Sequence, residues 1–483
     1  ATPENLLFGL LGVLLGTAVG ALPGLGPAIA ISLLLPLTFG FDPLTAFIMF
    51  GGIYYGAMYG GAMAAILANT PGDAAATATA LDGNPLARKG RAGAALKISM
   101  IGSFIGGTFA TFMLMILAPL LVEVALLFGP AEYFSLMILA LTIIVTVGGG
   151  SIEKAMFATL LGLGIAMIGI DLQSGVERLT FGSPQLASGV DVVLASIGLF
   201  AVGEALWIAS GGDSGEGKFA KVADKAGLSR KEWRRSFIGW SRGAGLGFFT
   251  GVLPGSGGTM AALMAYGIER RVSKYPEKFG TGVVEGVAAP EAANNAASGG
   301  SMVPLLALGI PGSATTAVML VAFQMYGLQP GPLLFQNSPE LVWGLIASLY
   351  ISNALLLALN LPLVGIWAKL LQIPHGLLYA SVLVFSTVGA FSLQGSIGDV
   401  IIVFVLGILA FALRRFGFPI APVLIGIVLG PMIEQEFRRA MAISAGDASI
   451  FLTRPISLFF LVLIALAILV PLFRKKSMAK TED

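Results

Sequence analysis

The sequence predicts an all-α membrane protein that crosses the bilayer many times and consists of two related halves. Of its 483 residues, 56% are hydrophobic and 11% are charged, and the mean hydropathy is +0.89. Apolar stretches such as 98–119 and 455–473 are long enough to span the hydrocarbon core of a bilayer. One glycine- and proline-rich motif occurs twice inside such stretches, which predicts two halves with discontinuous helices.

The composition excludes several kinds of chemistry. The chain has no cysteine, which excludes disulfides, thiolate metal sites and thiol nucleophiles, and its single histidine is His375. The net charge is +2, and the basic residues fall between apolar stretches, which is typical of orientation signals and not of a nucleic-acid surface. No catalytic set or transition-metal cluster is evident. We therefore expect no enzymatic activity, no cofactor and no nucleic-acid partner.

Each half begins with the repeated motif, Gly-x-x-x-Gly-x-Leu-Pro-Gly-x-Gly, at 16–26 and again at 247–257. A second interruption follows in each half, Asn-Thr-Pro-Gly-Asp at 69–73 and Gly-Ile-Pro-Gly-Ser at 309–313. Proline removes a backbone donor and glycine permits a sharp turn, so each interruption predicts a broken helix. In lipid the freed peptide groups are costly unless they are buried or line a polar cavity. A packed kink also explains one such motif, but four placed symmetrically favour a shared cavity.

The other spans follow from apolar runs. Gly52, Gly56 and Gly60 recur every four residues, which predicts a helix packed closely against a neighbour. Beyond the broken helices, spans are expected at 98–119, 133–148, 155–170, 190–209, 341–368, 377–393, 397–413, 416–433 and 455–473.

A long polar segment, 210–242, separates the halves. It divides the chain into a first transmembrane repeat, 1–209, a basic cytoplasmic linker, 210–242, and a second transmembrane repeat, 243–483. The basic end of this linker, 230–235, is expected to form an amphipathic helix on the inner leaflet.

Lysine and arginine orient the spans, because short cytoplasmic loops carry an excess of them. After the first copy of the motif the loop 36–43 has no lysine or arginine, whereas after the second copy the loop 269–278 is basic. After the later interruption of each half, the basic loop is instead in the first half. The segment 88–97 is basic, whereas 327–340 has no lysine or arginine. This crossing pattern predicts inverted-topology repeats.

The same charges predict two re-entrant hairpins. Arginines flank the segment 254–258 on both sides, so the chain is expected to enter and leave the bilayer on one side there, with a counterpart at 23–27. The breaks at 69–73 and 310–313 are expected in helices that cross completely. Hairpins and discontinuous helices in inverted repeats are typical of an elevator-type transporter, in which a moving unit slides against a scaffold.

The helix ends at these breaks define the expected site. A helix that restarts presents free N–H groups and a positive dipole end, which suit a carboxylate, and a helix that ends presents carbonyl oxygens to a cation such as Na⁺. The glycine- and proline-rich segments carry no cationic side chain, so a substrate's negative charge is expected to rest on dipoles and co-bound ions. The expected substrate-binding residues are Gly24, Gly26, Asn69, Thr70, Pro71, Gly72, Gly255, Ser256, Gly257, Pro311, Gly312 and Ser313.

Polar residues near the breaks are candidate ion ligands. Asp73 is the first choice, because a charge inside a spanning segment is costly without a function; the alternative is that it caps the restarted helix. Glu291 is a candidate for a cation or a proton; the alternatives are a cytoplasmic mouth or a scaffold hydrogen bond. The full set of ion candidates is Asn69, Asp73, Glu291, Asn294 and Asn295.

Several motifs of the first half resemble the TctA family, the large membrane subunit of the tripartite tricarboxylate transporters. The segments that carry the resemblance are Leu22–Pro27, Leu35–Gly40, Gly52–Gly56, Gly60–Gly61, Asn69–Gly72, Leu81–Gly83 and Arg91–Gly93. The resemblance covers essentially the whole chain.

The resemblance implies a multi-pass permease of the bacterial inner membrane. Its implied partners are a small four-helix membrane subunit (TctB-like), a periplasmic solute-binding protein (TctC-like) and the lipid bilayer. It implies import of citrate-like di- and tricarboxylates by cation symport, with Na⁺ as the expected coupling ion and H⁺ as the alternative. A passive organic-anion channel and an intramembrane enzyme are the competing functions.

Overall fold

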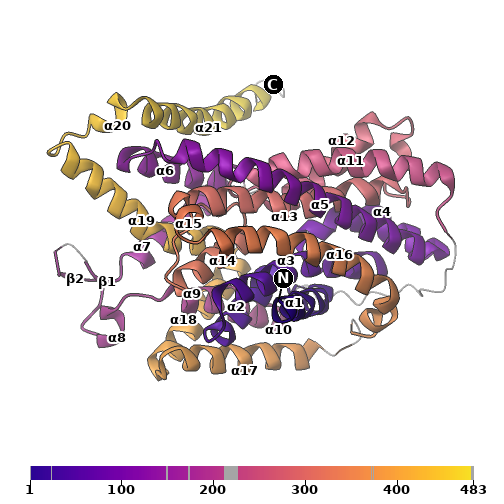
Figure 1. The fold of residues 1–483 in the computed structure, drawn as a ribbon, viewed down its shortest axis with the longest axis horizontal. Helices are drawn as coiled ribbons and strands as arrows, with labels where there is room; N and C mark the ends of the chain where they lie inside the picture. The colour runs from indigo at the N-terminus through magenta and orange to yellow at the C-terminus, as the bar shows by residue number, and fades with distance from the viewer. Residues whose placement is uncertain are drawn as a thin grey trace.

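The computed structural model describes residues 2–22, 24–147, 151–171, 174–211, 227–370, 373 and 375–479. These residues form helices and one small antiparallel sheet, in which β1 (Gly169–Ile170) pairs with β2 (Glu177–Arg178) (Figure 1). Up to residue 211 the helices are α1 (Pro3–Ala21), α2 (Pro27–Thr38), α3 (Pro43–Ala68), η1 (Ala74–Ala76), α4 (Thr77–Leu86), η2 (Ala87–Arg91), α5 (Ala92–Ala125), α6 (Pro130–Val147), α7 (Ile152–Ala166), α8 (Pro184–Ala187), α9 (Val192–Ser196), η3 (Ile197–Val202) and α10 (Gly203–Ala209). From residue 227 they are α11 (Arg230–Val252), α12 (Gly257–Val272), η4 (Pro276–Lys278), α13 (Glu285–Leu308), α14 (Ala314–Met325), α15 (Pro332–Asn337), α16 (Pro339–Leu370), α17 (His375–Gln394), α18 (Ile397–Arg415), α19 (Ala421–Ile443), α20 (Ile450–Thr453) and α21 (Pro455–Ala479).

Several helices have the length and composition of membrane spans. Within the described part of the chain, seven helices are long and apolar enough to cross a bilayer. They cover Pro3–Ala21, Ala74–Ala125, Pro130–Val147, Val192–Ala209, Pro339–Asn360, Gly376–Gln394 and Ile397–Arg415. The prediction of an all-α polytopic membrane protein is therefore confirmed.

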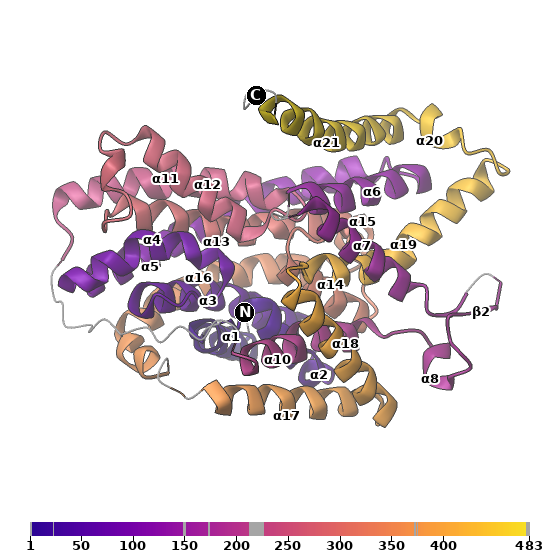
Figure 2. The same ribbon diagram turned by 180° about the vertical axis from the view of Figure 1, so that it is seen from behind.

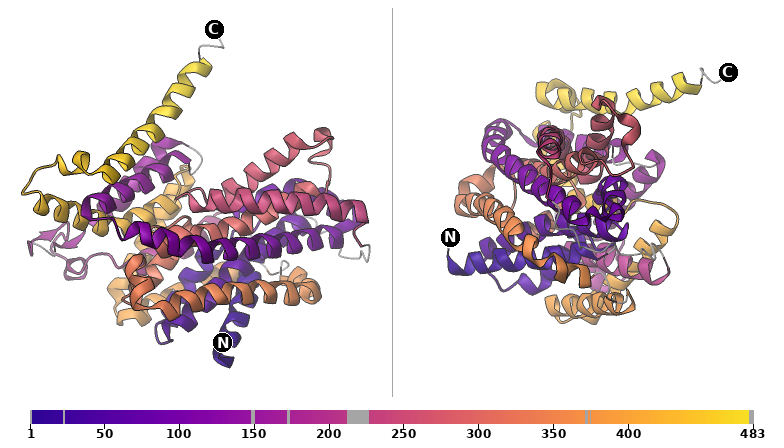
Figure 3. Two further views of the ribbon diagram at one scale, coloured as in Figure 1. Left: turned by 45° about the horizontal axis from the view of Figure 1, so that its top comes forward. Right: turned by 90° about the vertical axis from the view of Figure 1, so that its right-hand side faces the viewer.

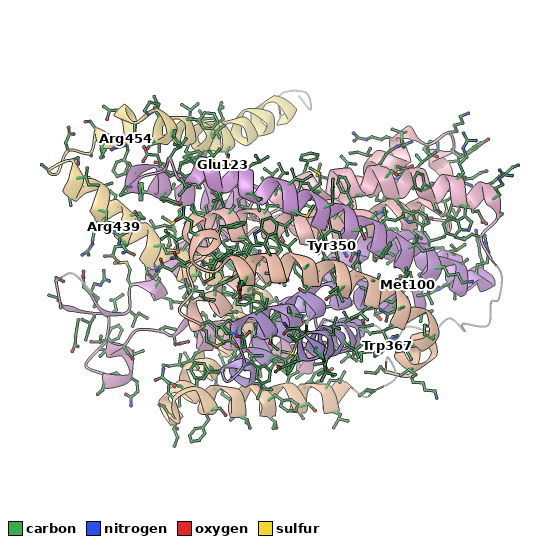
Figure 4. The ribbon with its side chains drawn as sticks, viewed as in Figure 1. Met100, Glu123, Tyr350, Trp367, Arg439 and Arg454 are labelled. Atoms are coloured by element: carbon green, nitrogen blue, oxygen red, sulfur yellow. The ribbon has the colours of Figure 1, made fainter. Side chains whose placement is uncertain are left out.

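The long helices α5, α13 and α16 run roughly along the longest axis of the molecule (Figure 1). Met100 on α5 and Trp367 on α16 lie toward one end of this axis, and Arg439 and Arg454 lie toward the other (Figure 4). The first part of α21 packs against α6, whereas its far end projects from the bundle (Figure 3).

Two central helices are enclosed by the others. All residues of α3 from Thr45 to Ala68 are buried, and so are all residues of α13 from Gly286 to Ala307. Both helices are rich in glycine and alanine, which lets neighbouring backbones approach closely. The core of the bundle is therefore built around backbone-to-backbone contacts.

Glycine stripes make these contacts in the same way on both central helices. A Cβ added at Gly16 or Gly20 of α1 would overlap the backbone of α3 at Ile53 or Ala57. Gly52, Gly56 and Gly60 of α3 in turn face the backbone of α1, so the predicted close packing is confirmed. On α11, Gly247 and Gly251 face Ala293 and Ala297 of α13 in the same manner. In both helix pairs, residue numbers at the contacts increase in the same direction along the two helices. The α1 helix therefore runs parallel to α3, and α11 runs parallel to α13.

The segment α3–α4 runs antiparallel to α13. The Tyr54 hydroxyl lies 3.2 Å from Ser301 Oγ. Farther along the chain, Asp82 of α4 accepts a hydrogen bond of 2.9 Å from the N–H of Val283, just before α13. As residue numbers increase from 54 to 82 along α3–α4, the numbers of the residues in contact decrease from 301 to 283.

The segment predicted as a polar linker is only partly described, because residues 212–226 lie outside the described ranges. Its basic end, predicted as an amphipathic helix, is helical and forms the beginning of α11, which continues without a break to Val252. Ser229 and Glu232 form a capping box that starts this helix. Arg91 of η2 pairs with Glu232, and Arg235 pairs with Glu285 of α13, so these charges anchor the helix to the bundle.

Candidate functional site

The first break joins α1 and α2 into a helical hairpin. The α1 helix ends where the N–H of Leu22 donates to the carbonyl of Val19 (3.0 Å), and Gly24 then adopts a left-handed φ of 79°. Thr45 Oγ1 of α3 donates to Asn5 Oδ1 of α1 (2.8 Å), so the chain has returned to the beginning of α1 after α2. The glycine permits this reversal because it has no Cβ. Pro23 lies outside the described residues.

The break between α11 and α12 has the same local geometry. The N–H of Leu253 donates to the carbonyl of Thr250 (3.1 Å), and Gly255 adopts a φ of 77°. Ser256 Oγ donates to the carbonyl of Leu253 (2.8 Å) and also contacts that of Thr250. The Ser256 hydroxyl therefore provides a donor for the carbonyls freed at the end of this helix.

The breaks after α3 and α13 also match each other. Each helix ends at a left-handed residue, Asn69 with a φ of 58° and Gly309 with a φ of 71°. Asp73 Oδ1 then accepts from the N–H of Ala75 (2.8 Å), and Ser313 Oγ accepts from the N–H of Thr316 (3.2 Å). Asp73 thus caps η1, as the alternative interpretation of this residue predicted. Capping engages one carboxylate oxygen and leaves Oδ2 beside Gly26, where an added Cβ would lie 2.7 Å from it.

The four breaks lie in one region of the bundle. The first two touch through Gly26 and Asp73, and the last two through a hydrogen bond of 3.0 Å from the N–H of Gly255 to the carbonyl of Gly312. The two pairs meet where a Cβ added at Gly258 would lie 3.4 Å from Ala75 Cβ. The Tyr54 hydroxyl also lies 3.2 Å from Ser313 Oγ. The structure thus brings together segments from the two halves of the chain.

A cavity of about 770 Å³ opens beside the first two breaks. The predicted residues on its wall are Gly24, Gly26, Asn69, Thr70, Pro71, Gly72 and Asp73. Ala314 and Thr315, which follow the last break, also line it. The predicted residues that do not line this cavity are Gly255, Ser256, Gly257, Pro311, Gly312 and Ser313. Of the segments at the last two breaks, only the start of α14 therefore contributes to the cavity wall.

Glu291 and its neighbours form a separate buried cluster. The Glu291 carboxylate accepts hydrogen bonds from Ser99 Oγ (2.9 Å) and Ser103 Oγ (3.3 Å) of α5, and it also contacts Thr79 Oγ1 of α4. Asn295 Nδ2 donates to Ser103 Oγ (2.9 Å). None of these residues lines the cavity. This arrangement fits the scaffold hydrogen bonds that were one alternative for Glu291.

Asn294, another predicted ion ligand, also lies apart from the cavity. It is buried, and neither its Oδ1 nor its Nδ2 has a hydrogen-bond partner among the described residues. Its Oδ1 faces Gly258 at the start of α12. It therefore lies at the junction between the two pairs of breaks.

Two charged residues of the cavity wall were not predicted as ligands. Glu204 of α10 and Arg414 of α18 form an ion pair, and both line the cavity with the first two breaks. The helices that carry them lie close to η3 on the face seen in Figure 2. A carboxylate inside the apolar run 190–209 was a signal for Glu204, whereas Arg414 was used only as an orientation signal.

This pair changes the expected electrostatics of the site. The breaks themselves carry no cationic side chain, as expected, but the cavity contains the guanidinium of Arg414. Asp73, Glu204 and Arg414 together carry one net negative charge when all three are ionised. Among the described residues, no group of three or more histidine, aspartate or glutamate side chains has the arrangement of a metal centre.

Spanning helices, paired breaks and a cavity with polar and charged residues on its wall define a polytopic membrane protein with a ligand-sized site, an arrangement typical of membrane transporters. The model of the tripartite tricarboxylate transporter TctA family matches residues 6–425. The chain belongs to this family, as its motifs predicted. Membership identifies it as the TctA-type membrane component of a tripartite transporter.

Two relatives come from Agrobacterium vitis. A protein described as an uncharacterized 52.8 kDa protein in the TAR-I ttuC' 3' region is 46% identical over 456 residues, which are 94% of this chain and 91% of that protein. Another, described as an uncharacterized protein in the TAR-II ttuC' 3' region, is 44% identical over 241 residues, which are 49% of this chain and 100% of that protein. No match was found among solved structures.

Proposed function

We propose that the protein is the permease subunit of a binding-protein-dependent secondary transporter that imports citrate-like di- and tricarboxylates together with a cation. The coupling ion in this proposal is Na⁺, with H⁺ as the alternative. The observation that carries the proposal is the cavity of about 770 Å³, whose wall combines helix breaks from distant parts of the chain with both signs of charge. Membership of the TctA family supports the transport of organic acids.

The wall of the cavity offers suitable donors for carboxylates. Ala28, in the first turn of α2, and Thr315, in the first turn of α14, bring two helix N-termini to it. The early N–H groups of a helix have no partner within the helix, and the positive end of its dipole attracts anions. Asn69 and Thr70 add an amide and a hydroxyl. In this proposal these groups orient the acid, and remaining predicted residues such as Gly257 and Ser313 hold the turns that shape the site.

The charges of the cavity support cation coupling. An organic acid would add negative charge to a wall whose ionised side chains already sum to one negative charge. Burying like charges together is unfavourable unless a cation accompanies them. Asp73 is the proposed ligand of that cation, because one of its oxygens is available beside Gly26.

We also propose that the chain consists of inverted repeats, 1–209 and 243–483, with the hairpins in the moving unit of an elevator. The matching turns at Gly24 and Gly255 and the antiparallel course of α3–α4 and α13 support this arrangement. It predicts that the loop after α12 faces the cytoplasm. The chain has no native cysteine, so Ser273→Cys can be labelled selectively. Labelling by a membrane-impermeant maleimide from outside intact cells would overturn this topology.

The proposed partners are a TctB-like small membrane subunit and a TctC-like periplasmic binding protein, and the proposed location is the bacterial inner membrane. Uptake of radiolabelled citrate and succinate into proteoliposomes tests the function. We expect accumulation that needs the binding protein and a Na⁺ or H⁺ gradient. Equilibration without either requirement would instead indicate a passive channel, and chemical conversion of the acid would indicate an intramembrane enzyme.

A further inference from the structure

The pair formed by Glu204 and Arg414 lies where two cavities meet. Both residues line the main cavity, and both also line a second cavity of about 300 Å³ beside η3 and α18. The Glu204 side chain is 10% exposed and that of Arg414 is 32% exposed. The guanidinium of Arg414 also lies 5.0 Å from the ring centre of Trp207, which favours its position at the wall. Arg414 is thus a fixed positive charge that reaches the space proposed for the substrate.

The Glu204 carboxylate is only half satisfied. Its Oε2 pairs with Arg414, whereas Oε1 is buried and has no hydrogen-bond partner in the described part of the structure. Oε1 faces the first break, because a Cβ added at Gly24 would lie 2.9 Å from it. A buried carboxylate oxygen without a donor is unfavourable. The Glu204 carboxylate is therefore incompletely satisfied by this pair, unlike a structural ion pair with every carboxylate oxygen engaged.

We propose that Arg414 binds a carboxylate of the transported acid and that Glu204 is an internal competitor for the same guanidinium. This inference rests on the proposed function, because it assigns a receptor for the acid within the same cavity. A guanidinium presents its donors in a planar fork that matches a carboxylate at two points. Glu204 offers the same chemical group as the substrate and therefore holds Arg414 while the site is empty. The acid replaces Glu204 by presenting a carboxylate of its own to the same guanidinium.

The competition predicts opposite effects for the two partners. Removing Arg414 deletes a charge-assisted hydrogen bond, which corresponds to at least about a tenfold loss of affinity. Removing the charge of Glu204 deletes the competitor and should lower the concentration of acid needed for half saturation. A purely structural pair would instead make both changes harmful in the same direction.

The experiment measures binding to the full chain in lipid nanodiscs, from the thermal stabilisation produced by increasing concentrations of citrate, succinate and neutral succinamide. The variants are Arg414→Gln, Arg414→Lys and Glu204→Gln. Arg415→Gln is the matched control, because Arg415 is the exposed neighbour on the same helix and lines neither cavity. We expect stabilisation of the wild type by an acid and not by succinamide, and wild-type behaviour of Arg415→Gln.

For Arg414→Gln we expect at least about a tenfold rise in the half-saturating concentration, with a smaller rise for Arg414→Lys, which keeps the charge but loses the fork. Glu204→Gln should bind more tightly than the wild type. The double variant Glu204→Gln/Arg414→Gln removes both charges and tests binding without an unpaired buried charge. Unchanged acid binding in Arg414→Gln or in the double variant would overturn this inference, and so would weaker binding in Glu204→Gln. Failure of every acid to stabilise the wild type would instead count against the proposed function.

Discussion

The two pairs of helix breaks have similar backbone conformations but different surroundings. Gly24 and Gly255 have nearly equal φ values of 79° and 77°, and Asn69 and Gly309 both end their helices in the left-handed region. The first pair, which includes Asp73, lines the cavity together with Glu204 and Arg414. The second pair is closed by the hydrogen bond from Gly255 to Gly312.

This difference teaches that the glycine- and proline-rich motif determines the turn, whereas the surrounding side chains decide whether the turn serves as a wall or as a support. Asp73 and Ser313 illustrate it, because each caps the helix after a break but only Asp73 lines the cavity. Substitutions at matched positions can test how far the two pairs are equivalent.

The largest expected effect concerns the shared backbone contacts. Gly20→Ala and Gly251→Ala each place a methyl group against the facing helix, at Ala57 and Ala297. Because backbone cannot move aside easily, we expect each change to lower the free energy of unfolding by about 1–3 kcal/mol or more. Thermal unfolding of the purified variants measures it. Gly245→Ala is the control, because nothing lies within 4 Å of its added Cβ. A much smaller effect at one of the two sites would show that the contacts are not equivalent.

The next effect separates the two helix caps. Asparagine caps a helix about as well as aspartate, so Asp73→Asn should keep the fold while it removes the charge proposed to bind the cation. We expect the Na⁺ concentration for half-maximal uptake to rise at least about tenfold. Ser313→Ala should instead lower stability by about 0.5–2 kcal/mol and leave the ion dependence unchanged. Uptake assays at varied Na⁺ and thermal unfolding distinguish the two. An unaltered Na⁺ dependence in Asp73→Asn would remove this residue from the ion site.

A smaller effect is expected at Asn69, whose backbone is left-handed and whose side chain lines the cavity. Asn69→Gly keeps the backbone conformation and deletes the side-chain amide. We expect the free energy of unfolding to change by at most about 0.5 kcal/mol, whereas the affinity for the acid falls. Asn69→Ala deletes the same amide and adds a backbone cost of about 1–2 kcal/mol. Unfolding and uptake are measured on both variants. Equal uptake by Asn69→Gly and the wild type would exclude the amide from substrate binding.

The smallest effect concerns the bases of the hairpins. A neutral hydrogen bond between Thr45 and Asn5 joins the start of α1 to α3, whereas the Arg91–Glu232 ion pair joins the start of α11 to η2. Glu232 lies at the polar start of α11, outside the seven candidate spans, and Arg91 lowers its pKa from 4.5 to about 2. Because the folded-state pKa is the lower one, the pair stabilises the fold above pH 4.5 and loses this contribution as the pH falls toward 2.

Glu232→Gln should therefore flatten the fall in thermal stability over that pH range, by a small amount because surface pairs are weak. Thermal unfolding at a series of pH values measures it, with Glu277→Gln at an exposed position of η4 as a control. A pH profile identical to that of the wild type would show that the pair contributes nothing to this dependence.

Local chemistry explains what the sequence could predict. Proline and glycine act on their own backbone, so the breaks at Gly24, Asn69, Gly255 and Gly309 could be located from sequence alone. The glycine stripe on α3 was also predictable, because a period of four residues marks one face of a helix. The membrane class followed from composition.

The rest depends on how distant segments meet. Nothing near Arg414 in the sequence indicates that it faces Glu204, more than 200 residues earlier. Glu291 looked like an ion ligand because it is a charge inside a span, yet hydroxyls from α4 and α5 surround it. Tertiary packing decides both cases, and no periodic pattern encodes it.

The glycine stripes also limit which parts of the molecule can slide. Carbonyl groups of α3 sit in the grooves left by Gly16 and Gly20 of α1, and α13 sits against α11 in the same way. Sliding α1 along α3 would move Gly16 and Gly20 out of register with those carbonyl groups, against a backbone that cannot yield. Each hairpin is therefore mechanically coupled to its buried neighbour. Any large displacement during a transport cycle must carry both together, with the slip plane located elsewhere in the bundle.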